Sequence, residues 1–265
     1  MSAPLVVVHP DPDVLAEAAA ARLLTRLLDV QSVRTPVHAV LTGGTVGIKT
    51  LHAVATSPLR AAVDWSGVHL WWGDERFLPD GDPDRNETQA RAALVDALVA
   101  DSGLPAEHVH AMPARGAVVD GAAVETPEQS AAAYAAELAA FAAPPATGAA
   151  DAREPAVPEF DVLLLGMGPD GHVASLFPGH EGLAARGATV GVHGSPKPPP
   201  ERVSLTFDAL RRAREVWVVA AGAEKAAQAA AALAGGAVAD VPAAGARGTE
   251  RTLWLLDAAA ASPSA

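Results

Sequence analysis

Short apolar runs alternate with longer, alanine-rich segments along most of the chain. The runs are hydrophobic without interruption, which is typical of strands buried on both faces of a parallel sheet. They lie at 5–8, 37–41, 68–72, 109–112, 160–165, 203–206, 215–220 and 252–256. Between them we expect helices at about 13–28, after 42–47, from about 86, over 127–141 and over 224–233. Thr126, followed by a proline, is expected to be the N-cap of the helix over 127–141.

This alternation predicts a single α/β domain over residues 1–265. We expect a doubly wound, mostly parallel sheet with helices on both faces, a Rossmann-like three-layer sandwich. The stretch 144–158 is small and proline-rich. We interpret it as a flexible surface excursion within the domain, because the half that follows it lacks the opening βαβ repeat of an independent nucleotide-binding fold. Ligands of such sheets bind beyond the carboxyl ends of the strands.

The segment 160–179, FDVLLLGMGPDGHVASLFPG, carries the strongest functional signal. A buried strand ends there in a glycine-rich turn that holds Asp170 and His172. A histidine at the carboxyl end of a strand can transfer protons near neutral pH, and a carboxylate two residues away can orient it. Gly166, Gly168 and Gly171 also match a dinucleotide-binding pattern, but Pro169 and Asp170 oppose a pyrophosphate. We interpret the glycines as allowing a sharp turn that projects Asp170 and His172 into a pocket.

The loop 42–47, TGGTVG, joins a predicted strand to a predicted helix. Its glycines and hydroxyls suit a phosphate, which the positive end of the following helix would favour. The loop alone is equally compatible with an ordinary tight turn. It is not a Walker A loop, because Ile48 intrudes before Lys49 and Thr50.

Charged residues follow other predicted strands. Asp74, Glu75 and Arg76 come after the run 68–72, so at least one of them should reach the crevice, although a solvated charge cluster is the usual fate of such residues. Arg202 and Lys225 also lie near strand ends. Lys225 falls in the first turn of a helix, where a cation is unfavourable unless an anion binds beside it.

Composition narrows the chemistry. The net charge of −12 argues against nucleic acid or an anionic membrane as the main partner. The absence of cysteine excludes disulfides, thiolate nucleophiles and Cys-ligated metals, and the histidines lack ligand spacing, so we expect no metal. There is no G-x-S-x-G elbow, so hydrolysis would use water activated by a base. No signal peptide or membrane-spanning run is evident, and we expect a soluble, cytoplasmic protein.

Several motifs, taken together and in order, resemble the 6-phosphogluconolactonase family, which shares a superfamily with glucosamine-6-phosphate deaminases. They are TGGT, WWGDERFLPDGDPDRN, LLGMGPDGHVASLFPGH, SPKPPPERVSLTF and GTERTLWLLD. The resemblance implies a single α/β domain without metal or organic cofactor, which hydrolyses 6-phosphoglucono-δ-lactone in the pentose phosphate pathway. We expect a monomer or weak homo-oligomer.

The resemblance also implies roles for individual residues. His172 would be the general acid/base with Asp170 as its neighbour, and Arg76 would contact the reacting end of the sugar. The loop Gly43, Gly44 and Thr45, together with Arg202 and Lys225, would hold the phosphate. Asp74 and Lys197 are further candidates for binding the substrate, with the part of Lys197 left open. Family members often read GGSTP where this chain reads GGTVG, but Thr45 keeps a hydroxyl. An amino-sugar phosphate isomerase/deaminase and a non-catalytic sugar-phosphate sensor remain the alternatives.

Overall fold

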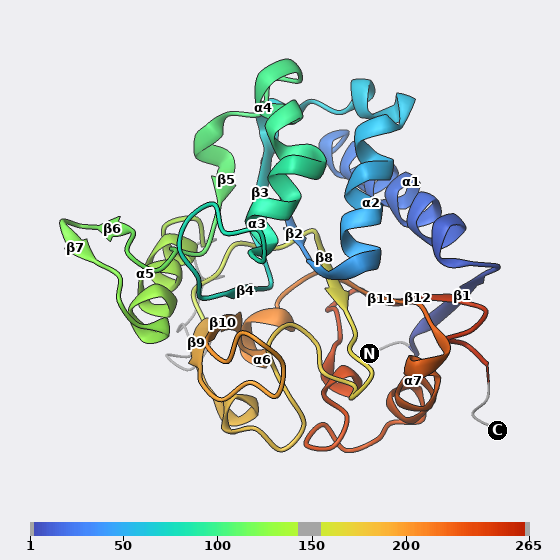
Figure 1. Cartoon of the computed structure of the whole chain (residues 1–265). Coiled ribbons are helices and arrows are strands. Elements are labelled where there is room, and N and C mark those ends of the chain that lie inside the picture. Colours follow the sequence, from blue (N-terminus) through green and yellow to red (C-terminus); the bar gives the residue numbers. More distant parts are fainter. Residues whose placement is uncertain (1–2, 143–154, 263–265) are drawn as a thin grey trace, which may run out of the picture.

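Seven strands form one parallel sheet in the order β1-β12-β11-β8-β2-β3-β5. The computed structural model describes residues 3–142 and 155–262, so most of the predicted excursion at 144–158 lies outside the described residues. The strand order places β1 beside β12, so that the two ends of the chain share one sheet (Figure 1). The strands are β1 Leu5–His9, β2 Val37–Leu41, β3 Val68–Trp72, β5 Val109–His110, β8 Val162–Gly166, β11 Glu215–Ala220 and β12 Arg251–Asp257.

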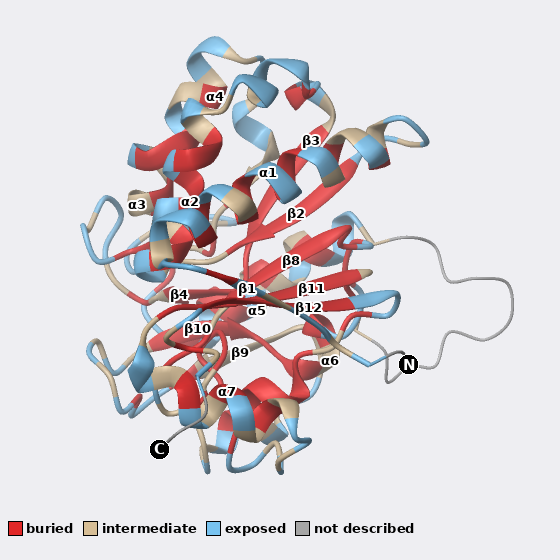
Figure 2. Ribbon diagram, turned by 90° about the vertical axis from the view of Figure 1, so that its right-hand side faces the viewer, coloured by how far each residue is buried: buried red, intermediate tan, exposed pale blue. Residues whose placement is uncertain are grey.

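Helices cover both faces of this sheet, as the alternating pattern predicts. One face carries α1 Pro12–Gln31, α2 Gly44–Thr56, α3 Asn86–Ala90 and α4 Asp96–Asp101, with a π-helical turn between the last two. The other carries α5 Pro127–Ala140, α6 Phe207–Leu210 and α7 Ala226–Leu233. Figure 2 shows α1–α4 above the buried strands and α6 and α7 below them. Within the described residues no helix combines the length and apolarity needed to cross a membrane.

The uninterrupted apolar runs are explained by two hydrophobic cores, one on each face of the sheet. Successive side chains of a strand point to opposite faces. Val40 and Trp71 accordingly pack in the core beneath α5–α7, whereas Leu41 and Trp72 pack in the core beneath α1–α4. The expected cap is also present, because Thr126 and Gln129 form a reciprocal capping box at the start of α5.

A second, three-stranded antiparallel sheet lies at the carboxyl end of the main sheet. It consists of β4 Asp74–Arg76, β10 Arg202–Leu205 and β9 Thr189–Val192, in the order β4-β10-β9. The run at 203–206 therefore belongs to this small sheet and not to the main one. Its pairing sets Arg202 opposite Arg76 and so determines one wall of the site. A short pair, β6 Val118–Val119 and β7 Ala122–Ala123, stands apart.

Candidate active site

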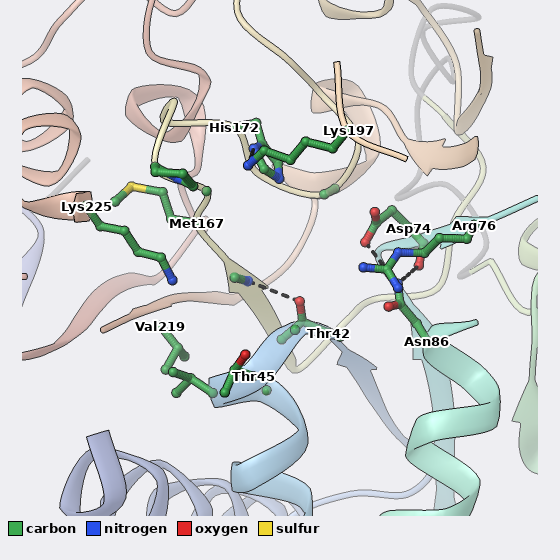
Figure 3. Close-up of a pocket in the computed structure, with 18 of the residues that line it drawn as sticks. Thr42, Thr45, Asp74, Arg76, Asn86, Met167, His172, Lys197, Val219 and Lys225 are labelled. Atoms are coloured by element: carbon green, nitrogen blue, oxygen red, sulfur yellow. Dashed lines mark hydrogen bonds between the residues drawn. The ribbon is translucent and has the colours of Figure 1, made fainter. Parts of the chain in front are cut away.

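A cavity of about 280 Å³ opens at the carboxyl ends of β2, β8 and β11. In Figure 3, Thr42 and Thr45 lie on one side of it, His172 and Lys197 on the opposite side, and Asp74 with Arg76 on a third. Of the candidate residues predicted from the sequence, all except Asp170 line this cavity. The lining residues are Thr42, Gly43, Gly44, Thr45, Val46, Gly47, Asp74, Arg76, Asn86, Gly166, Met167, Gly168, Pro169, His172, Ala174, Lys197, Arg202, Val219 and Lys225.

His172 and Asp170 form a hydrogen-bonded pair in the turn after β8. The His172 Nδ1 lies 2.5 Å from the Asp170 Oδ1, and the same oxygen accepts from the His172 backbone N–H at 3.3 Å. Because Nδ1 faces a carboxylate, it carries the proton, which leaves Nε2 as the basic nitrogen of the ring. Gly168 makes this arrangement possible, since a Cβ there would stand 2.1 Å from the imidazole.

Lys197 is the third member of this polar cluster, beside Asp170 and His172. Its Nζ lies 3.5 Å from the Asp170 Oδ1 and 3.3 Å from the His172 Nδ1. Burial alone would raise the pKa of Asp170, but the hydrogen bond from His172 and the charges of His172 and Lys197 outweigh it and hold that pKa far below its usual range. Asp170 is therefore a carboxylate throughout the neutral range and can orient the imidazole.

An apolar ring supports the histidine from below. Phe177 is 1% exposed, and its ring centroid lies 4.6 Å from that of His172. The Arg202 guanidinium lies over the same ring, 5.7 Å from its centroid. The position of the imidazole is thus determined by a carboxylate at one edge and a buried aromatic ring beneath it.

Alternation along β4 decides which charges reach the cavity. Asp74 and Arg76 line it, while Glu75 points away, 1% exposed, and accepts hydrogen bonds from the backbone N–H groups of Asn86 and Glu87 at the start of α3. Burial foremost raises the pKa of Glu75 to about 7. The carboxylate of Glu75 therefore caps a helix and does not face the ligand.

Asp74 and Arg76 are each anchored by polar contacts. The Asp74 Oδ2 accepts from the Ser175 hydroxyl at 2.7 Å, and the Asp74 carbonyl accepts from the Asn86 amide at 2.8 Å. The Arg76 Nη1 donates to the Asp84 carbonyl at 2.5 Å. Its Nε is buried without a partner among the described residues, which leaves the guanidinium with unused donor capacity beside the cavity.

The glycine loop presents the N-terminus of α2 to the cavity. Gly43 is the N-cap and no side chain caps the helix, so its first backbone N–H groups are available to an anion. Thr42 ties this loop to β8, because its hydroxyl accepts from the Gly166 N–H at 3.1 Å. A Cβ on Gly43 would lie 1.9 Å from the Asn86 Oδ1, so the loop packs directly on α3.

Lys225 enters from the start of α7, and Figure 3 shows its ammonium directed toward the Thr45 side of the cavity. Burial foremost lowers the pKa of Lys225, with the charge of Lys197 acting in the same direction. Among the described residues no carboxylate lies within ion-pair distance of this ammonium. A half-buried cation that has no ion-pair partner among the described residues, beside an uncapped helix N-terminus, suits a phosphate.

The sequence predicts no role for two polar residues of the site, Asn86 and Ser175. Asn86 and Ser175 fix Asp74 through hydrogen bonds, and their positions inside the sequence motifs give no sign of that role. Thr42 belongs to the glycine loop for which the sequence predicts phosphate binding, and its hydroxyl fixes β8. Arg202 lines the cavity as expected, but its guanidinium donates to loop carbonyls, described below. No cluster of three or more side chains able to hold a metal ion occurs in the part of the chain that the structure describes.

Comparison with known proteins agrees with this geometry. A family model described as glucosamine-6-phosphate isomerases/6-phosphogluconolactonase matches residues 10–254. The 6-phosphogluconolactonase of Streptomyces coelicolor is 55% identical over 98% of this chain and 94% of its own, and that of Mycobacterium tuberculosis is 43% identical over 98% of each. The solved structure of the Trypanosoma brucei 6-phosphogluconolactonase superposes with a TM-score of 0.81 at 29% identity, over 97% of both chains. The chain belongs to the glucosamine-6-phosphate isomerase/6-phosphogluconolactonase family.

Proposed function

We propose that this protein hydrolyses 6-phosphoglucono-δ-lactone to 6-phosphogluconate in the oxidative pentose phosphate pathway, with His172 assisting the attack of water. The observation that carries the proposal is the placement of the His172–Asp170 pair on the opposite side of one cavity from an uncapped helix N-terminus. The first suits a reacting carbonyl and the second a phosphate. The two relatives at 55% and 43% identity are both 6-phosphogluconolactonases.

The reaction needs a base, an oxyanion donor and an acid. The His172 Nε2 accepts a proton from water as the water oxygen attacks the lactone carbonyl carbon. The bond from that carbon to the ring oxygen then breaks, and the imidazolium returns the proton to the ring oxygen. Such general base and acid catalysis contributes about 10²–10⁴-fold in rate. Asp170 holds the ring in the required tautomer and stabilises the imidazolium that forms.

The oxyanion would be stabilised by Arg76, by Lys197 or by a backbone N–H of the turn 166–171. Arg76 has an unused Nε donor, and the ammonium of Lys197 lies next to His172. One well-placed donor of this kind is typically worth about 10²–10³-fold. Asp74, fixed by Ser175 and Asn86, would accept from a hydroxyl of the sugar.

The phosphate would bind at the N-terminus of α2, to Gly43, Gly44 and Thr45, with Lys225 supplying a positive charge. Holding the phosphate fixes the lactone over His172, which converts binding into positioning. We further propose that the enzyme works as a monomer or weak homo-oligomer in the cytoplasm.

Replacement of His172 tests the proposal. His172→Ala should lower the single-turnover rate of lactone hydrolysis by about 10²–10⁴-fold, because the base acts in the transition state. Affinity for 6-phosphogluconate should change little, since the phosphate contacts persist. His52→Ala, at an exposed position on α2, is the matched control. Near-normal turnover by His172→Ala would eliminate His172 as the base.

A further inference from the structure

The guanidinium of Arg202 is engaged by the loop that precedes it. Its Nε donates to the Pro199 carbonyl at 3.2 Å, and its Nη2 donates to the Pro198 and Lys197 carbonyls at 2.9 and 3.2 Å. The residue is only 4% exposed. A planar fork with three such contacts is held in one orientation, which a point charge on a flexible stem would not be.

The same loop is closed from its other side by Ser195. The Ser195 hydroxyl donates to the Lys197 carbonyl at 2.9 Å and accepts from the Lys197 N–H at 3.2 Å. The Ser195 N–H donates to the Pro200 carbonyl at 3.0 Å. The backbone of Lys197 is therefore fixed by Ser195 on one side and by Arg202 on the other.

Arg202 is itself fixed in the frame that carries His172. It lies in β10, where it pairs with Arg76 of β4 and Val192 of β9. Its guanidinium lies over Phe177, and the Phe177 ring contacts His172. Because Arg202 is fixed in β10 and its guanidinium is bonded to the loop 197–199, it can hold that loop, and with it the Lys197 ammonium, at a constant distance from β10.

We propose that Arg202 is a positioning residue that fixes Lys197 beside the His172–Asp170 pair, and that it does not hold the substrate phosphate. This inference rests on the proposed function and assigns Arg202 a role different from the one its charge suggests. Phosphate recognition then falls to the N-terminus of α2 and Lys225. Lys197 becomes the cation of the reacting end, with its Nζ 3.3 Å from the His172 Nδ1.

The test is a double-mutant cycle. Arg202→Lys and Arg202→Gln are each combined with Lys197→Met, and kcat for the lactone is measured together with the inhibition constant of inorganic phosphate. Arg202→Lys keeps the charge but loses the fork, so it should lower kcat roughly 10- to 100-fold, as a misplaced group does. The phosphate inhibition constant should stay within about twofold. With Lys197→Met already present, the Arg202 changes should cost little more, because coupled residues are not additive.

Two further variants keep the test decisive. Ser195→Ala removes the opposite contact to the Lys197 carbonyl and should lower kcat in the same direction, even if the Arg202 variants are too unstable to assay. Arg186→Gln, at an arginine whose side chain is 85% exposed and paired with Asp208, should leave kcat unchanged.

Two results would overturn the inference. One is a phosphate inhibition constant that rises in step with the loss of activity in Arg202→Lys or Arg202→Gln, which would make Arg202 a phosphate ligand. The other is an additive cycle, in which Arg202 and Lys197 act independently. Failure of the wild-type protein to accelerate lactone opening would instead remove the proposed function on which the inference rests, so the two failures are distinguishable.

Discussion

Two glycines of this site are packed so closely by neighbouring side chains that no larger residue fits at either position. Gly168 is required by the imidazole of His172 and Gly43 by the amide of Asn86, since a Cβ at either would collide with these groups. Both glycines stand in loops whose chemistry the sequence indicates. A Cβ on Gly168 would collide with His172, which belongs to the same motif. A Cβ on Gly43 would collide with Asn86, which lies outside the TGGT motif, so this constraint could not be predicted from that motif.

Removal of the Lys225 ammonium should weaken binding of the substrate phosphate. Lys225→Ala should raise KM for the lactone and the inhibition constant of phosphate by roughly 10- to 100-fold, because a charge-assisted contact to phosphate is worth about 1.5–3 kcal/mol. The value of kcat should change little, since the phosphate charge is constant during ring opening. Steady-state kinetics with phosphate as inhibitor measures both. Lys49→Ala, whose parent side chain pairs with Asp13, is the control. An unchanged phosphate constant would place the phosphate elsewhere.

At the scale of elements, β2, β3 and β5 bring several imidazoles together. His38, His69 and His110 lie on these strands, and His108 stacks on His69 with ring centroids 3.8 Å apart. The His69 Nδ1 lies 2.8 Å from the His110 Nε2, and Trp71 donates to the His38 Nδ1. Burial foremost, then the other imidazoles, lowers the pKa of His38 to about 3 and that of His69 to about 4.

These shifts predict how stability depends on pH. The unfolded chain binds protons at both histidines below about pH 6.5, whereas the folded protein does not, so the free energy of unfolding falls as pH falls from 6.5 toward 4. Between pH 8 and pH 5 each histidine should cost roughly 2 kcal/mol. Urea unfolding of the wild type and of His38→Gln at both pH values measures the effect, and the variant should lose about 2 kcal/mol less.

The exposed His52 provides the comparison, because His52→Gln should lose as much stability on acidification as the wild type does. Glu75 opposes the trend, since its raised pKa of about 7 lowers stability as pH rises from 4.5 to 7. It contributes equally to all three proteins. Equal acid losses in wild type and His38→Gln would contradict the account of the histidine cluster.

At the scale of the whole molecule, the sequence pattern predicts the layers and the location of the site but not every partner. Buried strands and caps are local features, and parallel strands place their following loops together, so the cavity at the ends of β2, β8 and β11 was foreseeable. The small sheet β4-β10-β9 was not, because its pairing joins segments far apart in the chain. The surroundings of Arg202 follow from that pairing.

The most direct measurement concerns the choice between lactone hydrolysis and deamination. Isomerisation and deamination of an amino sugar move protons at carbon, which would call for a further carboxylate beside the histidine, and Phe177 occupies that place. Here the position holds a buried ring packed under His172, which offers no carboxylate. Lactone opening needs none, since no carbon-bound proton is removed.

The assay follows 6-phosphoglucono-δ-lactone opening above its spontaneous rate, with the product trapped by 6-phosphogluconate dehydrogenase, in parallel with ammonia release from glucosamine-6-phosphate. We predict strong acceleration of lactone opening by the wild type, its loss in His172→Ala, and no ammonia from either protein. Ammonia release without any acceleration of lactone opening would contradict the account.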